Sequence, residues 1–432
     1  MEHKMKKTAI IVIAFILILS LLASIILVVY SLITGVTDDA CESNVVMEVQ
    51  IEEPDNILVE EDGEPSWHPE ELESPKPEEE GSIFDISQTD ISQTPYGYIS
   101  VRYIQHLSDH FYGRSPFSYR EMEAAQWIVD ELLAMGYGEE DIYWQEFNWE
   151  SVRGHTLWGS RAWEELEEDT WIWGDAPLRE NQLSQNIILT VPGQSSRTII
   201  VGAHYDSVIY AGASDNASGT ALLMESARRM LYFDNYHTII YIFFGAEEPG
   251  LFGVYYYYNS MSEDDFNNMV MMVNADILIE GPAVIFGAGY APTQYWLEAL
   301  PEELLDQGWW WPQRWWVDYL EIRGNQLTEQ IDEIAVALNM KHNINLISDY
   351  RFVLSPSDHW MFAFNGHTVV NLIGLEPGPG IHQVIEGYNS TVVHTPRDEF
   401  HYINTRWPGM MESNMKAFSI FLEGILLANY GD

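Results

Sequence analysis

Two pairs of side chains with metal-binding or acid–base chemistry follow short apolar runs of the chain: His204 with Asp206, and Glu247 with Glu248. A third group, Asp215, comes just before a segment with the pattern of a helix. In open α/β sheets, ligands bind in the crevice outside the carboxyl ends of the strands. These five side chains are therefore expected to point into one crevice.

Zinc takes histidine nitrogen and carboxylate oxygen, and a catalytic zinc keeps one position open for water. Two metals about 3.5–4 Å apart can stabilise both the attacking and the leaving oxygen of a hydrolysis. Such a pair needs one bridging carboxylate, further ligands for each metal and a base for the water. The chain offers that set, with ligand candidates His204, Asp215, Glu248, Asp276 and His394, and with Glu247 as the candidate base.

Helical patterns recur along the part of the chain after Tyr96. The segment 118–135 carries an apolar stripe, and Ser118 with Glu121 predicts a capping box at its start. Gly136 is a typical residue at a helix end. Further helices are expected at 292–300, 326–340 and 410–427.

Short apolar runs predict the strands, and the runs 186–191 and 198–201 are expected to form a hairpin around Pro192 and Gly193. Strands that alternate with helices favour an α/β domain with a mainly parallel mixed sheet and helices on both faces. The other strands are expected at 141–149, 238–244, 269–273, 284–286, 345–347 and 369–373.

The first part of the chain has the pattern of a membrane anchor and a linker. The apolar run 8–33 is longer than the apolar core of a cleaved signal peptide, which has roughly 7 to 15 residues. Lysines in the tail 1–7 place the N-terminus in the cytoplasm and the rest of the chain outside. The segment 34–95 is rich in Glu and Pro and is expected to be an extended linker. The catalytic domain is then 96–432, and the protein is expected to be a single-pass protein of the cell membrane.

The chain is strongly acidic, with 66 Asp and Glu against 20 Lys and Arg and a formal net charge of −46. Binding to a nucleic-acid backbone needs Lys and Arg, so nucleic acid is not an expected partner. Cys41 is the one cysteine of the sequence, so no disulfide can form within the chain.

Six motifs, in order along the chain, resemble the aminopeptidase Y and aminopeptidase S family of di-zinc peptidases. They read VGAHYDSV, GASDNASG, FFGAEEPGLFG, VNAD, SDHWMF and HTPRDEF, and FYGRS at 111–115 is a weaker early match. The related proteins include glutamate carboxypeptidases, glutaminyl cyclases and the catalytically inactive transferrin receptor. The resemblance implies a zinc-peptidase fold of the phosphorylase/hydrolase-like type, peptide substrates and two zinc ions per chain.

The resemblance also implies a role for each site residue. His204 and Asp276 would bind one zinc ion, Glu248 and His394 the other, and Asp215 would bridge them. Glu247 would be the general base. Asp206 would orient His204, as the hydrogen-bond partner of a ligand histidine does.

Three interpretations of the function stay open at this point. The first is a membrane-anchored aminopeptidase, and the second is a glutaminyl cyclase-like enzyme with one zinc ion. The third is a receptor-like ectodomain without activity, which predicts lost ligands. Asp358 and His359 are expected to pack or to support ligands, Asp398 to support the His394 loop, and the Trp-rich segment 309–316 to form core, lid or substrate platform. The natural substrate and the oligomeric state stay open.

Overall fold

A computed structural model describes residues 91–152, 170–289, 326–349, 357–365, 367–377, 382–385 and 388–431. All of them belong to one compact unit, Glu80–Asp432. The expected membrane anchor 8–33, the linker as far as residue 90, the helix 292–300 and the Trp-rich segment 309–316 lie outside these residues. Within the described ranges, no helix is both long and apolar enough to cross a membrane.

An eight-stranded mixed sheet in the order β1-β2-β4-β3-β5-β8-β6-β7 forms the centre of the domain. The pairs β3–β4, β3–β5, β5–β8 and β6–β7 are parallel, whereas β1–β2, β2–β4 and β6–β8 are antiparallel. The predicted mixed α/β sheet is therefore confirmed. The strands are β1 (Ile142–Asn148), β2 (Leu183–Val191), β3 (Ser195–His204), β4 (His237–Phe244), β5 (Met269–Ala275), β6 (Ala283–Gly289), β7 (Ile347–Asp349) and β8 (Val369–Gly374).

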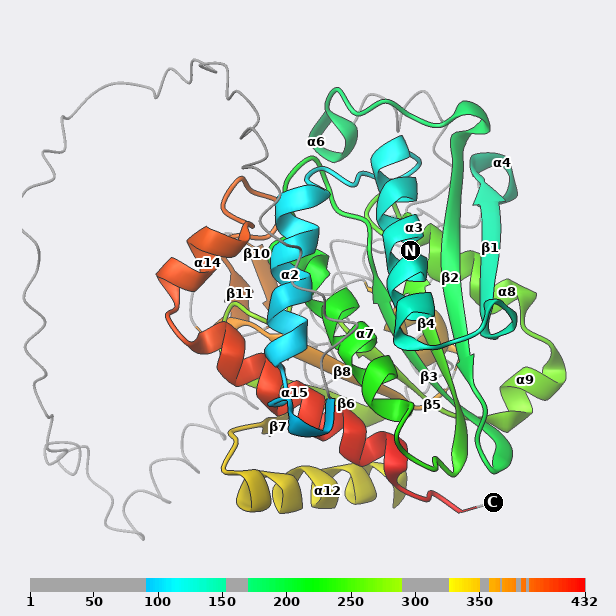
Figure 1. Ribbon diagram of the computed structural model, residues 1–432, viewed down its shortest axis with the longest axis vertical. Helices are drawn as coiled ribbons and strands as arrows, with labels where there is room; N and C mark the ends of the chain where they lie inside the picture. The colour runs from blue at the N-terminus through cyan, green and yellow to red at the C-terminus, as the bar shows by residue number, and fades with distance from the viewer. Residues whose placement is uncertain are drawn as a thin grey trace, which may run out of the picture. The chain divides into compact units, whose positions relative to one another are not determined.

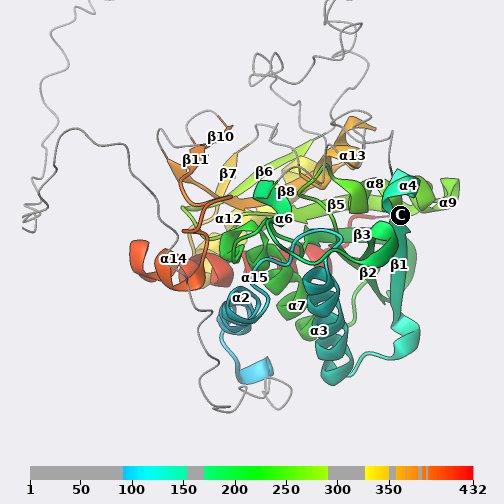
Figure 2. The same cartoon turned by 90° about the horizontal axis from the view of Figure 1, so that it is seen from above.

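Helices cover both faces of this sheet, as Figures 1 and 2 show. One face carries α2 (Tyr98–His110), α3 (Tyr119–Met135), α7 (Ser218–Met230) and α15 (Met410–Leu427), and the other carries α8 (Phe252–Ser260) and α13 (His359–Phe364). Three further helices are longer than one turn, namely α9 (Glu263–Asn268), α12 (Gln326–His342) and α14 (Phe400–Arg406). The described residues also include a small sheet of β9 (Glu376–Pro377), β10 (His382–Ile385) and β11 (Tyr388–Ser390).

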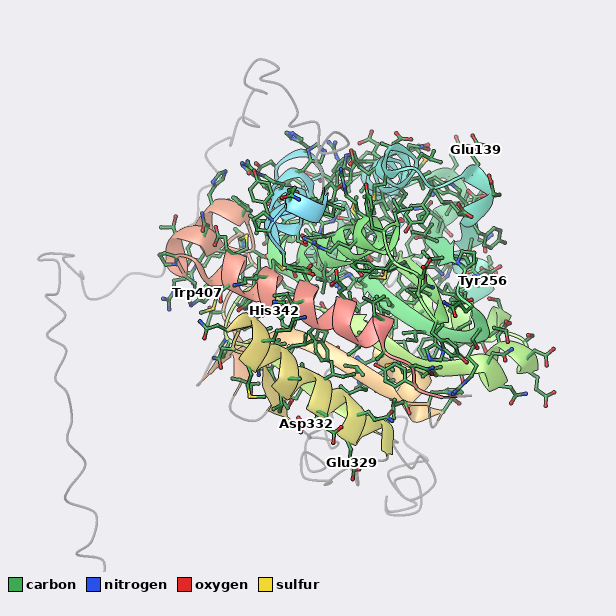
Figure 3. All side chains as sticks on the ribbon, turned by 60° about the horizontal axis from the view of Figure 1, so that its bottom comes forward. Glu139, Tyr256, Glu329, Asp332, His342 and Trp407 are labelled. Atoms are coloured by element: carbon green, nitrogen blue, oxygen red, sulfur yellow. The ribbon has the colours of Figure 1, made fainter. Side chains whose placement is uncertain are left out.

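Each face of the sheet has its own apolar cluster, because successive side chains of a strand point to opposite faces. On the α7 side, Ile199 and Val201 of β3 pack with Leu222 of α7. On the α8 side, Ile200 packs with Phe362 of α13. The central strand β3 is therefore buried on both faces, as parallel strands usually are. Figure 3 shows α12 beside α15, with the exposed Glu329 on its outer side.

The predicted hairpin of β2 and β3 is wrong, because β4 lies between the two strands. Ile240 of β4 stands opposite Thr190 of β2 and Ile200 of β3. The start of β4 is held in this place by Thr238, whose hydroxyl accepts from Gly193 N at 3.1 Å and donates to Ser195 O at 3.0 Å. The Pro–Gly turn therefore carries the chain past one strand position instead of closing a hairpin.

The start of α3 differs from the predicted capping box in one of its two hydrogen bonds. The Ser118 hydroxyl accepts from Glu121 N at 3.1 Å, as expected. The Glu121 carboxylate, however, accepts from Phe117 N at 2.7 Å, while Ser118 N donates to Ser115 O. Gly136 ends the helix in the left-handed conformation, with φ of 117°, as predicted.

Packing of the domain begins before the predicted boundary at Tyr96. Ile91 is buried in the main apolar cluster, and the Arg229 guanidinium donates to Thr94 O and Pro95 O. The same guanidinium lies over the Tyr96 ring, 4.0 Å from its centroid. These contacts fix the end of the linker segment to α7.

Candidate active site

Three neighbouring strands bring site residues to one edge of the sheet. β4, β3 and β5 run parallel, so their carboxyl ends lie together. His204 is the last residue of β3 and stands opposite Phe244, the last residue of β4. Glu247 follows β4 after a short turn, and Asp276 directly follows β5. The carboxyl ends of these strands therefore bring His204, Glu247 and Asp276 to one edge of the sheet.

Asp215 lies in the turn η6 (Ala213–Ala217), which leads into α7, and its peptide bond to Asn216 is cis. Asn216 fixes this turn to the end of β5. Its side chain donates to Ala275 O at 2.9 Å and accepts from Gly219 N at 2.8 Å. The Asp215 carboxylate is consequently held against the carboxyl ends of the strands.

The five predicted ligand residues form two groups that share Asp215. In the first, His204 Nε2 lies 3.1 Å from Asp215 Oδ1 and 3.5 Å from Asp276 Oδ1. In the second, His394 Nε2 lies 3.1 Å from Asp215 Oδ2 and 3.0 Å from Glu248 Oε2. Each oxygen of Asp215 thus faces a different imidazole.

These two groups fit a pair of zinc ions. Each consists of one imidazole nitrogen and carboxylate oxygens, which are the donor atoms that zinc takes in proteins. One ligand atom each from His204, Asp215 and Glu248 can be chosen so that all three lie within 4.8 Å of one another. Asp276 Oδ1 is buried and has no hydrogen-bond partner among the described residues, so it is available to a cation.

Buried negative charge dominates the electrostatics of the site. Burial lowers the pKa of His204, but the charge of Glu247 and the contacts with neighbouring aspartates outweigh it, so the pKa of His204 lies well above its usual value. Burial likewise lowers the pKa of His394, and Glu248 and Asp215 raise it well above the usual range. Burial raises the pKa of Asp215, but its two histidine partners hold it below the usual range. The crowded carboxylates therefore favour a positive charge among them, either a proton or a metal cation.

Asp206 contacts both halves of the site. His204 Nδ1 lies 3.6 Å from Asp206 Oδ1 and 3.2 Å from the Asp206 main-chain oxygen. The orienting role of the Asp206 carboxylate stays a prediction. The two carboxylate oxygens also accept from Glu247 N at 3.1 Å and from Glu248 N at 3.2 Å. The sequence did not reveal this second contact, which ties the turn after β4 to the end of β3.

Asp398 joins the His394 loop to the Asp215 turn. Its carboxylate accepts from Ser214 N at 2.6 Å and from Asp215 N at 3.1 Å, and its main-chain oxygen accepts from Ala213 N. Burial and the neighbouring charge of Asp215 raise the pKa of Asp398 to about 7. Asp398, which was expected to support the His394 loop, thus connects this loop to the turn that carries Asp215.

The segment Ser357–His359 reaches the site through a residue that the sequence analysis did not single out. The Ser357 hydroxyl donates to Asp276 Oδ2 at 2.8 Å and accepts from Asn274 Nδ2 at 2.9 Å. Asp358 and His359 are both buried, and burial raises the pKa of Asp358 well above its usual value. Their predicted packing or supporting role stays a prediction.

Arg114, in the weakest of the sequence motifs, holds the chain between Asp206 and Asp215. Its guanidinium is fully buried and donates to three main-chain oxygens, those of Tyr205, Ala211 and Gly212, at 2.5, 2.5 and 2.8 Å. Burial lowers the pKa of Arg114 to about 10. The motif marked this residue, but the sequence gave no indication of its partners.

This mixed α/β fold, with imidazole and carboxylate groups gathered at its strand ends, has the donor atoms of a candidate zinc centre. The model of peptidase family M28 matches residues 186–419 of the 432, which is more than half of the chain. The chain belongs to peptidase family M28, and the family resemblance of the motifs is confirmed.

Individual relatives share less of the chain. Aminopeptidase YwaD of Bacillus subtilis (strain 168) is 38% identical over 102 residues, which are 23% of this chain and 22% of the relative. The matched region is 22% of the length of aminopeptidase YwaD and 26% of that of leucine aminopeptidase 1 of Blastomyces gilchristii (strain SLH14081). The chain therefore spans only about a quarter of the length of these curated relatives.

Two solved structures share the fold. BSAP, a zinc aminopeptidase from Bacillus subtilis, superposes with a TM-score of 0.54 and 16% identity, covering 78% of this chain and 97% of BSAP. Bacteroides thetaiotaomicron glutaminyl cyclase superposes with a TM-score of 0.50 and 15% identity, covering 77% of this chain and 98% of the cyclase. At these identities the likeness describes the fold and leaves the reaction open.

We predict that the chain binds two zinc ions at saturation and that Asp215 contributes to both. Asp276→Ala should then keep one zinc ion, whereas Asp215→Ala should weaken both sites. Metal analysis after equilibrium dialysis against zinc measures the stoichiometry. Equal losses in the two variants, or one zinc ion in the unmodified chain, would contradict the shared role of Asp215. A ligand that binds only the folded state stabilises it by about 2.7 kcal/mol when its free concentration is about 100 times its Kd. Removal of zinc by a chelator should therefore also lower the Tm.

Proposed function

We propose that this protein is a zinc-dependent aminopeptidase that removes N-terminal residues from peptides. The observation that carries the proposal is the pair of ligand groups around Asp215, with Glu247 next to Glu248 in the chain. His204 and Asp276 would hold one zinc ion, and His394 and Glu248 the other, with one Asp215 oxygen on each. Bound zinc supplies Lewis-acid chemistry, which polarises a carbonyl and lowers the pKa of water.

Glu247 is the residue best placed to move the proton. Its backbone is fixed by the hydrogen bond from Glu247 N to Asp206, and its neighbour Glu248 belongs to a ligand group. Burial raises the pKa of Glu247 well above its usual value; the charge of His204 opposes this, and those of nearby carboxylates add to it. A carboxylate in this place can take a proton from water and return it in the next step, which is the role of a general base.

The peptide bond is cleaved by addition of water and transfer of one proton. Water attacks the scissile carbonyl carbon and gives a proton to a Glu247 carboxylate oxygen. Glu247 then gives this proton to the nitrogen of the leaving amine as the carbon–nitrogen bond breaks. The carboxylate is thereby restored, and the products are a free amino acid and a shortened peptide.

The charge of the site supports a preference for substrates with a free N-terminus. An α-ammonium group carries one positive charge, and the site holds two acidic side chains that the proposal assigns to neither zinc ion, Asp206 and Glu247. Clefts lined by charge of one sign raise the local concentration of the opposite charge. An acylated N-terminus lacks that charge and should be a poor substrate.

A glutaminyl cyclase-like reaction with one zinc ion is the second candidate, and the shared fold supports it. The two complete ligand groups favour the aminopeptidase, because a single metal would leave one of the two groups of carboxylate and imidazole without its cation. A receptor-like protein without activity is disfavoured, because every predicted ligand residue is present in the site.

A substrate panel tests the reaction. Aminoacyl-anilides should be hydrolysed, their N-acetylated counterparts should not, and a zinc chelator should abolish the activity. A peptide with an N-terminal Gln reports the alternative, because a cyclase converts it to a pyroglutamyl peptide with release of ammonia. Cyclisation without anilide hydrolysis would replace the proposal by its alternative.

The proposal includes a membrane anchor at 8–33 and a catalytic domain outside the cytoplasm. It rests on the apolar sequence of this segment and on the lysines that precede it. The full chain should stay in the membrane pellet after alkaline extraction, and protease added to intact cells should release the activity. Recovery of the uncleaved chain in the soluble fraction would argue against the anchor.

Glu247→Gln should keep both zinc ions and lose turnover. Glutamine is nearly isosteric, so the packing is retained, but its amide cannot take the proton of water. General-base contributions are typically about 10²- to 10⁴-fold, so kcat should fall by at least that factor while KM changes little. Normal turnover with full zinc would mean that another group is the base.

Glu248→Gln is the matched control for this substitution. It changes the adjacent side chain, whose Oε2 lies 3.0 Å from His394 Nε2 in a ligand group. Zinc content should therefore fall together with activity, and added zinc should restore part of it. If the two variants exchanged these behaviours, the roles of Glu247 and Glu248 would be reversed.

A further inference from the structure

The turn that carries the proposed base is held by side chains through four consecutive main-chain amides. Gly245 N donates to Asn186 Oδ1 at 3.1 Å, and Ala246 N donates to Glu121 Oε1 at 3.0 Å. The next two amides donate to the two oxygens of Asp206, at 3.1 and 3.2 Å. Three separate elements, β2, α3 and the end of β3, therefore fix the backbone from residue 245 to 248.

The turn needs such support because its backbone is in an unfavourable conformation. Ala246 has φ of 51°, in the left-handed region that residues with a side chain rarely adopt. Strained residues of this kind persist where the surrounding structure fixes them, and they cluster at functional sites. A glycine at this position would adopt the same φ without strain.

Of the three residues whose side chains accept from these amides, Glu121 is the one on helix α3. It lies in the first turn of α3, is fully buried, and belongs to a segment that precedes the part matched by the family model. Its Oε1 accepts from Ser184 Oγ at 2.7 Å as well as from Ala246 N, and its Oε2 accepts from Phe117 N at 2.7 Å. Phe117 is also left-handed, with φ of 60°. One carboxylate thus fixes two left-handed residues in separate segments.

We propose that Glu121 is a positioning residue for the reaction, which holds Glu247 in its productive place through Ala246. The inference rests on the proposed role of Glu247 as the base. Glu121 touches neither the ligand groups nor the base in any hydrogen bond of the described residues; its contact is with the amide next to Glu247. The expected effect is therefore on turnover and on the order of the turn, with zinc binding retained.

In Glu121→Gln, the side chain no longer has an acceptor oxygen for each of the two amides, Phe117 N and Ala246 N. A glutamine has one acceptor oxygen, so either Ala246 N or Phe117 N would face the amide group, which is a donor. Misplacement by about 1 Å can cost a catalytic group about 10²-fold in rate. In the full chain, kcat on an aminoacyl-anilide should fall about 10- to 100-fold, with KM little changed and zinc content equal to that of the unmodified protein.

Glu123→Gln on the same helix is the matched control. Its carboxylate is exposed and pairs with Arg120 at 3.1 Å on the surface. This variant should keep the kcat and KM of the unmodified chain. Glu121→Asp, which keeps both oxygens but ends one methylene short of Ala246, is the milder variant if Glu121→Gln does not fold, and it should lower kcat in the same direction.

Ala246→Gly separates positioning from general support of the fold. If Glu121 acts by holding the strained Ala246, glycine at 246 should recover part of the kcat that Glu121→Gln loses. If Glu121 only supports α3, the two substitutions should add independently. Additive losses, or an unchanged kcat in Glu121→Gln and Glu121→Asp, would overturn the proposal.

Hydrogen exchange gives a result that does not depend on the reaction. The amides of Gly245–Glu248 should exchange faster in Glu121→Gln, while those of the neighbouring strand β5 should keep their protection. If the unmodified chain hydrolyses no anilide, the proposed function fails, and the exchange result still decides whether Glu121 holds the turn. Unchanged exchange at the turn would overturn the proposal even in an active enzyme.

Discussion

The contact of Asp215 with two histidines is the interaction on which the site depends. One oxygen faces His204 and the other faces His394, so a single carboxylate sets the relative position of two groups that are far apart in the sequence. Burial of this carboxylate is unfavourable unless positive charge lies close to both oxygens. Burial raises the pKa of Asp215, and its two histidine partners nevertheless hold it below the usual range.

Around this centre, buried carboxylates serve mainly as acceptors for main-chain amides. Asp398 accepts from the two amides at Ser214 and Asp215, Asp206 accepts from those of Glu247 and Glu248, and Glu121 accepts from two amides farther out. The amide hydrogen bonds satisfy these buried carboxyl oxygens, as is usual for buried polar groups in folded proteins. The two turns that carry Asp215 and the pair Glu247 and Glu248 are fixed in this way, which preorganises the site.

The sequence predicted the parts of this architecture that depend on local pattern. Apolar runs predicted the central strands, and the residues directly after them became the site because parallel strands share one carboxyl edge. The hairpin of β2 and β3 was wrong because neighbours in sequence need not be neighbours in a sheet, and β4 returns to fill the space between them. The individual roles of the ligand candidates came from the family resemblance, since type and spacing alone offered only a set.

The partners of the supporting residues could not be predicted, because they are far away in the sequence. Glu121 had the pattern of a helix cap, yet one of its partners, Ala246, lies 125 positions later. Asp398 meets Ser214 across 184 positions. Such contacts follow from the assembled fold, and a single sequence without the fold contains no local signal for them.

The measurement that tests the central claim most directly is the location of metal by anomalous diffraction at the zinc edge. Crystals of the zinc-saturated protein should give two peaks on either side of Asp215, one beside His204 and Asp276 and the other beside His394 and Glu248. A single peak at one of these groups, with the other group free of metal at saturation, would contradict the account of a shared two-metal centre.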